Sequence, residues 1–209
     1  MSDLIQIVDT ALASATARSG THLVCKPGCS QCCVGVFPIS HQDAFRLREA
    51  LAALDQTDPE RSQRIRGRAT ASRARLTPHF PGDPRTGILN PDYESSPLFI
   101  DEIQVESGES IGDTEPCPVL DPITGTCDLY EARPIVCRTF GPPMRTPGDP
   151  GETNLATCEL CFTHATTEEI AACELDPTIP AQEETSNETF NATHNLRGQT
   201  LIAYALRAI

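Results

Sequence analysis

Apolar residues recur at helical spacing near the start of the chain. Between residues 2 and 18 they form a single stripe of Leu4, Ile5, Val8, Ala11, Leu12 and Ala15. Apolar positions three and four residues apart lie on one face of an α-helix. The pattern therefore predicts an amphipathic helix over residues 2–18.

Two further helices are predicted before residue 77. Ser40 is a favourable N-cap residue, and the apolar stripe that follows it consists of Ala44, Leu47, Ala50, Leu51 and Leu54. Asp58-Pro59 then begins an Arg-rich segment, and proline suits the first turn of a helix. We expect helices over residues 41–54 and 59–76.

Shorter elements are predicted in the rest of the chain. Residues 34–39 are a β-favouring run, and a strand is predicted from Leu98 to Val105. Residues 77–97 are rich in proline and turn-forming residues, which is typical of an irregular connection. A linker over residues 176–186 and an amphipathic helix over residues 187–207 complete the pattern.

Cysteine content changes this picture. Ten of the 209 residues are cysteine, whereas Trp is absent and Phe and Tyr together number only ten. The chain has neither a recognisable secretory signal nor the roughly 20 consecutive apolar residues of a membrane span. We expect a cytoplasmic protein, in which thiolate-bound metal is favoured over disulfides. Secretion by another route would instead predict disulfides, with Asn187 and Asn191 as glycosylation acceptors.

The first cysteine group is the run Cys25-Lys-Pro-Gly-Cys29-Ser-Gln-Cys32-Cys33. Its Pro-Gly pair favours a tight turn that would let Cys25 and Cys29 face one centre. If a helix begins near Cys29, then Cys32 and Cys33 lie one turn further along and face the same side. A disulfide between adjacent cysteines would be strained, so this spacing indicates metal ligation.

The second cysteine group comprises Cys117, Cys127 and Cys137. A turn between the first two would place them on adjacent short strands, and Pro134 suits the first turn of a short helix that carries the third. Arg133 and Arg138 flank this group. Their charge would offset that of the thiolates, or they would form surface ion pairs with carboxylates.

The third group is the pair Cys158-Glu-Leu-Cys161 on a predicted broken helix over residues 157–173. A C-x-x-C pair suits a zinc knuckle, part of a cluster site, or a redox pair. The other two groups contain seven cysteines, so one member of this pair would complete eight. His164 is interpreted as an ordinary surface or core histidine.

Cys173 stands apart from the three groups. It follows Ile170 by three residues in an ordinary helical pattern, and no second sulfur lies at knuckle spacing. We interpret it as a small buried hydrophobic residue on an apolar face rather than as a ligand.

These motifs, in this order, resemble the YkgJ-type cysteine-cluster family. The resemblance rests on C-x3-C-x2-C-C at residues 25–33 and C-P-x-L…C-x-x-Y-x-x-R-P-x-x-C-R-x-F at residues 117–140, and it extends over roughly residues 22–165. The family is described as a zinc- or iron-chelating domain with eight shared cysteines. The resemblance implies seven ligands here, Cys25, Cys29, Cys32, Cys33, Cys117, Cys127 and Cys137, with Cys158 or Cys161 as the eighth. Flagellin lysine N-methylases share a related cysteine pattern, which is an analogy about the site and not about the reaction.

All-sulfur sites suit zinc or an iron–sulfur cluster such as [4Fe–4S], and they exclude magnesium and calcium. Three function hypotheses follow: a redox or metal-handling protein, a lysine-methylase-like enzyme with the cluster near its active site, and an interaction module with structural zinc. The chain has no phosphate-binding glycine loop, nucleophile elbow or H-E-x-x-H motif, which argues against the enzyme.

The expected fold is α+β, with short strands and cysteine knuckles covered by several helices around the metal. Residues 1–176 would form the cysteine-cluster domain, and residues 177–209 a linker and a C-terminal helix packed on it. The first and second cysteine groups should meet in space although they are far apart in sequence.

Charge bears on the partners of the protein. The net charge of −13 argues against nucleic acid and anionic membranes as partners. The exception is a concentration of six arginines between Arg61 and Arg75. They are interpreted either as a solvated helix face or as a docking surface for an acidic protein partner or for the chain's own acidic stretches.

Overall fold

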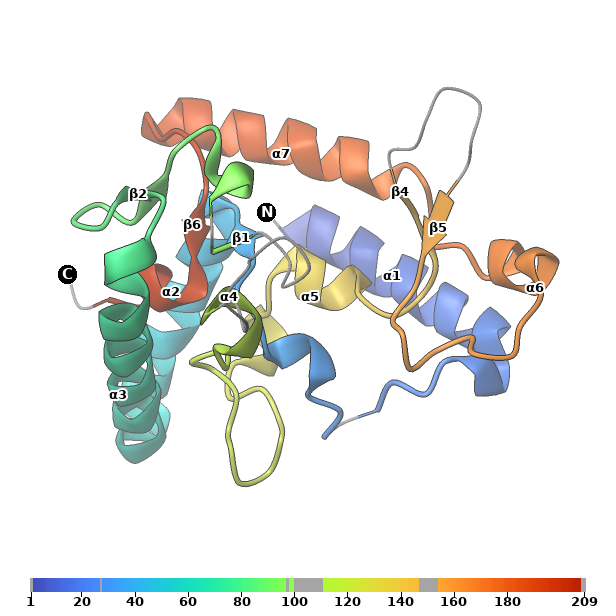
Figure 1. The fold of residues 1–209 in the computed structure, drawn as a ribbon, viewed down its shortest axis with the longest axis horizontal. Helices are drawn as coiled ribbons and strands as arrows, with labels where there is room; N and C mark the ends of the chain where they lie inside the picture. Colours follow the sequence, from blue (N-terminus) through green and yellow to red (C-terminus); the bar gives the residue numbers. More distant parts are fainter. Residues whose placement is uncertain (1, 27, 97, 100–110, 147–153, 208–209) are drawn as a thin grey trace. The chain divides into compact units, whose positions relative to one another are not determined.

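The computed structural model describes residues 2–26, 28–96, 98–99, 111–146 and 154–207 (Figure 1). These residues are mostly helical, with three two-stranded antiparallel sheets, which confirms the predicted α+β class. The chain divides into two compact units. Unit 1 comprises Met1–Lys26 and Ile135–Glu188, and unit 2 comprises Pro27–Pro134 and Thr189–Ile209. The predicted organisation into residues 1–176 and 177–209 stays a prediction.

Unit 1 is organised around its N-terminal helix. Its elements are α1 (Ser2–Ser19), η1 (Gly20–His22), α5 (Ile135–Thr139), the antiparallel hairpin of β4 (Met144–Thr146) and β5 (Asn154–Ala156), α6 (Thr167–Ala172) and the first part of α7 (Ile179–His194). Helix α1 confirms the predicted N-terminal helix. Its fully buried Val8 and Ala15 pack against Ile135, Leu175 and Ile179, which form the core of this unit.

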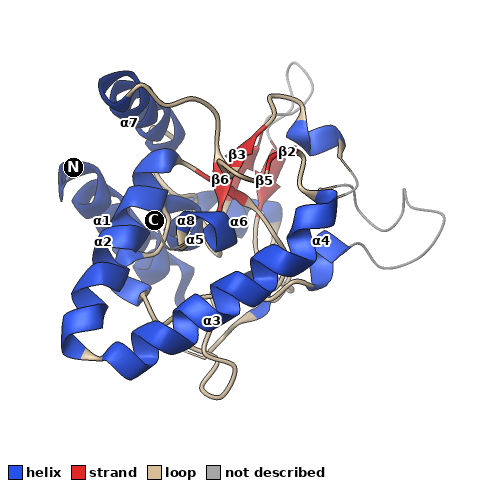
Figure 2. Ribbon diagram, turned by 90° about the vertical axis from the view of Figure 1, so that its left-hand side faces the viewer, coloured by secondary structure: helices blue, strands red, loops and turns tan. Residues whose placement is uncertain are grey.

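Unit 2 is organised around two long helices. Its helices are α2 (His41–Thr57), α3 (Pro59–Leu76), α4 (Ile111–Thr114) and α8 (Ile202–Ala205), together with the short η2 (Gln31–Cys33), η3 (Thr77–His79), η4 (Tyr93–Ser95) and η6 (Tyr130–Ala132). Helices α2, α3 and α8 pack against one another (Figure 2). The Ser40 hydroxyl accepts a 3.0 Å hydrogen bond from the amide of Asp43, and Asp58 caps α3 in the same way. Both predicted helices are confirmed.

Two small sheets belong to unit 2. Strand β1 (Pro38–Ile39) pairs with β6 (Thr200–Leu201), and β2 (Gly82–Asp83) pairs with β3 (Ile88–Leu89), both antiparallel. The first pairing places Leu201 and the following Tyr204 in a buried apolar group, in which the ring of Tyr204 lies 4.2 Å from that of Phe80. No helix in the described part of the chain is long and apolar enough to cross a membrane.

The predictions for residues 176–207 and for the strand after Pro97 need correction. Most of the predicted linker is helical, because α7 begins at Ile179. The helix predicted over residues 187–207 ends at His194, since Asn195 has a left-handed φ of 52°, and β6 and α8 follow. In the predicted strand, Leu98 and Phe99 lie in a turn, and residues 100–105 are outside the described residues.

Candidate metal centre

The first cysteine group is divided between the units: Cys25 belongs to unit 1, and the other three cysteines belong to unit 2. The helix considered as a condition in the sequence, beginning near Cys29, is in the structure the short η2, which begins at Gln31. The amide of Cys33 donates a 2.9 Å hydrogen bond to Ser30, which closes this turn. The side chains of Cys32 and Cys33 are hydrogen-bonded to each other, so two sulfurs lie side by side.

A compact loop connects Cys117 to Cys127 in unit 2. The predicted pair of strands is reduced to a single antiparallel bridge between Leu120 and Cys127. The amide of Leu120 donates a 2.9 Å hydrogen bond to the carbonyl of Cys117, and this turn draws the chain out of the extended conformation. Gly125 has a left-handed φ of 68°, and a Cβ there would lie 3.1 Å from the carbonyl oxygen of Gly28. The tip of the loop therefore packs against the residue before Cys29.

The two cysteine segments of unit 2 lie side by side. The amide of Cys117 donates a 2.7 Å hydrogen bond to the carbonyl of Cys33, and Val34 forms an isolated bridge with Pro116. A further hydrogen bond of 2.9 Å joins the amide of Gly35 to the carbonyl of Glu115. The predicted convergence of the first and second groups is confirmed for their members in unit 2.

The surroundings of these thiols favour the protonated form. Burial raises the pKa of Cys117 to about 12, and the neighbouring Cys127 adds to the increase. Burial likewise raises the pKa of Cys127. The pKa of Cys32 is raised by its hydrogen bond to Cys33, by burial and by repulsion from a second thiolate. Paired, partly buried sulfurs of this kind become thiolates when a cation supplies the opposing charge, which fits zinc or iron as the ion.

The arginines of α3 are largely engaged within unit 2. Four of the six, all of them described residues, form ion pairs: Arg61 and Arg68 with Asp128, Arg66 with Asp55, and Arg75 with Glu115. These contacts support the interpretation that the arginines serve the chain's own acidic residues. An acidic protein partner at this helix stays a prediction. No pattern in the sequence indicated a role for Asp128 and Glu115, although each lies within two residues of a candidate ligand.

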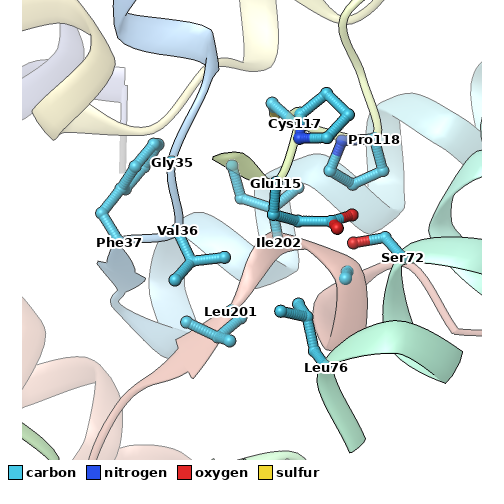
Figure 3. A pocket seen from close by; sticks show the side chains of 12 residues that line it. Gly35, Val36, Phe37, Ser72, Leu76, Glu115, Cys117, Pro118, Leu201 and Ile202 are labelled. Carbon is cyan, nitrogen blue, oxygen red and sulfur yellow. The ribbon is translucent and has the colours of Figure 1, made fainter. Parts of the chain in front are cut away.

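A small cavity borders Cys117 (Figure 3). It has a volume of about 20 Å³, and the residues that line it include Val36, Phe37, Ser72, Leu76, Glu115, Pro118, Leu201 and Ile202. The carboxylate of Glu115 points toward the hydroxyl of Ser72. Burial alone would raise the pKa of Glu115, but the contacts with Arg75 and Ser72 lower it below the ordinary value. A cavity of this volume has room for about one water molecule, so it is too small for an organic substrate.

The remaining candidate cysteines lie in unit 1. Cys137 lies on the predicted short helix, α5, which begins immediately after Pro134. Cys158 and Cys161 lie in turns, because Phe162 has a left-handed φ of 57° and a helix cannot continue through it, so the predicted broken helix is reduced to α6. The sulfur of Cys25 lies close to the backbone of Gly141, where a Cβ would be 3.6 Å away. The amide of Cys158 donates a 3.5 Å hydrogen bond to the carbonyl of the same glycine.

Cys173 shares a buried apolar group with the C-x-x-C pair. Cys158, Cys161, Phe162 and Cys173 are buried together, and Ile170 packs against them. The predicted apolar face of Ile170 and Cys173 is confirmed, whereas the proximity of Cys173 to two candidate ligands was not foreseen. His164 is exposed, in keeping with an ordinary surface histidine.

Arg133 and Arg138 differ in their contacts. The guanidinium of Arg133 lies 3.9 Å from the ring centre of Tyr130, and its charge acts to lower the pKa of Cys127 against the effect of burial. Arg138 forms two hydrogen bonds, of 2.6 and 2.8 Å, with the carboxylate of Asp9. Arg133 thus supports the predicted charge compensation of the thiolates. Arg138 instead forms an ion pair with a carboxylate, which was the alternative interpretation.

None of the ten cysteines, all of which belong to the described residues, is joined in a disulfide. Within the described ranges, no three side chains of His, Cys, Asp or Glu are grouped as a ready-made metal site. Unit 2 instead presents two sulfur pairs on segments that are joined through their backbones. Side-chain rotation would therefore have to complete the coordination of an ion.

Comparison with known proteins adds to this geometry. A model of the CxxCxxCC family, which is described as a putative zinc- or iron-chelating domain, matches residues 24–188. The chain belongs to this family. The match spans all ten cysteines, and it confirms the resemblance drawn from the sequence motifs. No curated protein and no solved structure matches the chain. Membership of the CxxCxxCC family identifies the cysteines as a metal-binding group without assigning individual ligands.

Proposed function

We propose that the chain holds a [4Fe–4S] cluster or zinc through its cysteine thiolates, in a redox or metal-handling role. The observation that carries this proposal is the junction of Cys33 with Cys117, each accompanied by a second thiol nearby, Cys32 or Cys127. Sulfur donors select zinc and iron–sulfur clusters over magnesium and calcium. Membership of the CxxCxxCC family supports the same ligand chemistry.

Each unit holds proposed ligands of its own. They are Cys29, Cys32, Cys33, Cys117 and Cys127 in unit 2, and Cys25, Cys137, Cys158 and Cys161 in unit 1. Structural zinc takes four tetrahedral ligands, and a [4Fe–4S] cluster takes four thiolates. Eight ligands therefore suit two such sites, or one cluster with further cysteines that do not bind it, and Cys158 and Cys161 are alternative candidates for the eighth position.

The protein's part in this chemistry is to hold the sulfurs in place, and the charge of the bound ion would favour their thiolate form. A bound zinc ion would supply positive charge to the thiolates, and a cluster would in addition supply one-electron redox chemistry. Burial raises the pKa of Cys117 and Cys127, which favours the thiol form of both in the metal-free protein. Binding therefore releases protons, and the apparent metal affinity decreases as the pH falls.

We infer a reducing compartment, the cytoplasm, as the place of action. The ten cysteines form no disulfide among the described residues. Thiols of this number are kept reduced in the cytosol and tend to pair in oxidising compartments.

The two alternative functions have less support. An enzyme that acts at Cys117 would need a substrate pocket there, and the cavity beside Cys117 has a volume of only about 20 Å³. An interaction module docking through α3 needs available arginines, and four of the six already pair with acidic residues of unit 2. We therefore favour the metal-binding role.

Anaerobic purification followed by metal analysis tests the proposal. Iron and acid-labile sulfide in stoichiometric amounts, with a brown colour, would identify a cluster. Colourless protein with stoichiometric zinc would identify the zinc form. Folded protein that contains none of these, and that takes up neither zinc nor a reconstituted cluster, would refute the proposed function.

A further inference from the structure

Three arginines of α3 contact the chain on both sides of Cys117 and directly after Cys127. Arg75 donates two hydrogen bonds, of 2.8 and 2.7 Å, to Glu115, two residues before Cys117. Arg68 donates a 2.8 Å hydrogen bond to the carbonyl of Pro118, the residue after Cys117. These contacts fasten the Cys117 segment to a long, well-packed helix.

Asp128, the residue after Cys127, receives two arginines at once. Arg61 donates a 2.6 Å hydrogen bond to one of its carboxylate oxygens, and Arg68 binds the other. The amide of Asp128 donates a 2.7 Å hydrogen bond to the carbonyl of Val119. A single guanidinium, that of Arg68, therefore contacts both arms of the loop that carries the two thiols.

Burial of the carboxylate distinguishes these contacts from ordinary surface ion pairs. The side chain of Asp128 is only 6% exposed and that of Glu115 only 5%. In the pair between Arg66 and Asp55 on the same helix, both side chains are 37% exposed. Arg68 itself is 25% exposed and Arg75 52%. Removing such an arginine would leave a buried carboxylate without its opposite charge, which is costly, whereas pairs exposed on both sides contribute little. The exposed pair of Arg66 with Asp55 is therefore a matched control on the same helix.

We propose that Arg68, acting through Asp128 and the carbonyl of Pro118, positions Cys117 and Cys127 for metal binding. This inference rests on the proposed function, in which both cysteines are ligands. Arginine suits the role because its planar fork presents several donors in a fixed geometry, so one side chain holds two acceptors at a set separation. Lysine carries the same charge but does not reproduce this geometry. Arg68 is thus a positioning residue, which acts on the metal only through the two thiols.

The test compares four variants of the full chain: Arg68→Met, Arg68→Lys, Asp128→Asn and the control Arg66→Met. The reduced, metal-free proteins are titrated with Co²⁺ in competition with a chelator, and the thiolate-to-cobalt charge-transfer absorption is recorded. Residues that orient metal ligands typically contribute about 10- to 100-fold to metal affinity. We expect losses of that size and an altered spectrum for Arg68→Met, Arg68→Lys and Asp128→Asn. Arg66→Met should match the unchanged chain.

Three results would overturn the inference. The first is an unchanged affinity and spectrum in Arg68→Met despite a lower stability of the metal-free protein, which would leave Arg68 a purely structural role. The second is full recovery in Arg68→Lys, which would assign the effect to charge alone. The third is an equal loss in Arg66→Met. If Arg68→Met does not fold, the positioning role is tested with Arg68→Lys and Asp128→Asn. Asp128→Asn preserves the shape of the side chain, and the Co²⁺ spectrum of both variants is read in the same way.

Cys117→Ser separates this inference from the proposed function. If Cys117→Ser loses Co²⁺ binding while the Arg68 variants retain it, the positioning role fails and the ligand assignment stands. If Cys117→Ser binds Co²⁺ with unchanged affinity and spectrum, the assignment of Cys117 as a ligand fails, and the positioning role fails with it.

Discussion

The backbone amide of Cys117 donates a 2.7 Å hydrogen bond to the carbonyl oxygen of Cys33. This bond joins two cysteine segments that are far apart in sequence, and it uses no side-chain atom. Both sulfurs therefore remain available as ligands while their backbones are held in register. The junction would give the proposed metal site of unit 2 a framework that belongs to the fold itself.

Removal of a ligand from this framework should release metal. We expect Cys117→Ser and Cys33→Ser to contain less than the stoichiometric amount of metal, because each removes a thiolate from the converging segments. Cys173→Ala is the control, since Cys173 packs in an apolar group in unit 1 and is not among the proposed ligands. It should keep its metal and lose about 1 kcal/mol of stability through lost packing. Metal per chain, measured after anaerobic purification, checks all three; loss in Cys173→Ala alone would reverse the assignment.

Metal should stabilise the folded chain strongly. The cysteines extend from Cys25 to Cys173, and large aromatic residues are few. Because the unfolded chain has no preformed site, the free energy of metal binding adds to the free energy of unfolding. Chelation under reducing conditions should lower the melting temperature markedly. The same melting temperature before and after removal, with the loss of metal verified, would contradict this expectation.

The stability of the metal-free protein should depend on alkaline pH through Cys117. Burial raises the pKa of this thiol from an ordinary 9.0 to about 12 in the folded state. The folded chain therefore holds the proton more tightly than the unfolded chain. The resulting stabilisation is fully present below the unfolded pKa and is lost as the pH rises toward the folded value.

Urea unfolding of the metal-free protein between about pH 8 and pH 10 measures this dependence. We expect the free energy of unfolding to fall with pH, and to fall less steeply in Cys117→Ser. The contributions of ionisable groups that both proteins share cancel when the two pH slopes are compared. Equal slopes would show that Cys117 ionises alike in the folded and unfolded states.

The turn between Cys117 and Cys127 should be sensitive to a single methyl group. Gly125→Ala places a side chain at a φ of 68° and a Cβ 3.1 Å from the carbonyl of Gly28. The left-handed conformation alone costs about 1–2 kcal/mol for a residue with a Cβ. We expect that loss of stability in urea unfolding, together with weaker Co²⁺ binding, because the turn sets the relation of the two thiols.

Gly67→Ala is the matched control for Gly125→Ala. Gly67 lies within α3, and no atom lies within 4 Å of an added Cβ. Alanine inside a helix is favoured over glycine by roughly 0.5–1 kcal/mol. This variant should be more stable than the unchanged chain and should bind Co²⁺ equally well. A gain of stability in Gly125→Ala would argue against the left-handed turn.

Local signals account for the part of the fold that the sequence predicted. The stripe from Leu4 to Ala15, the Ser40 cap and the pair Asp58-Pro59 act within a few residues, and α1, α2 and α3 form where these signals lie. The final helix was misplaced for the opposite reason. Leu201 is held by pairing with Pro38, a contact that no local pattern reveals.

The candidate site likewise has a part that the local sequence predicts and a part that only the fold reveals. Cysteine spacing, and with it the metal chemistry, is a local property that the sequence states directly. The residues that fix the cysteines were missed because their partners are distant: Asp128 is paired with Arg61, and Glu115 with Arg75. In the sequence, Glu115 lies in an acidic run that is typical of solvated surface. Only the fold brings it to α3, where it is 5% exposed.

The pairing of β6 with β1 has a consequence for biosynthesis. Leu201 and Tyr204 complete a buried apolar group of unit 2, and they are translated after every cysteine of the chain. While the ribosome is still adding the last segment of unit 2, the sulfurs of Cys32, Cys33, Cys117 and Cys127 belong to a nascent chain whose core is not yet closed. Chains fold progressively during synthesis. The four thiols are therefore present in the growing chain before the apolar group that Leu201 and Tyr204 complete can close.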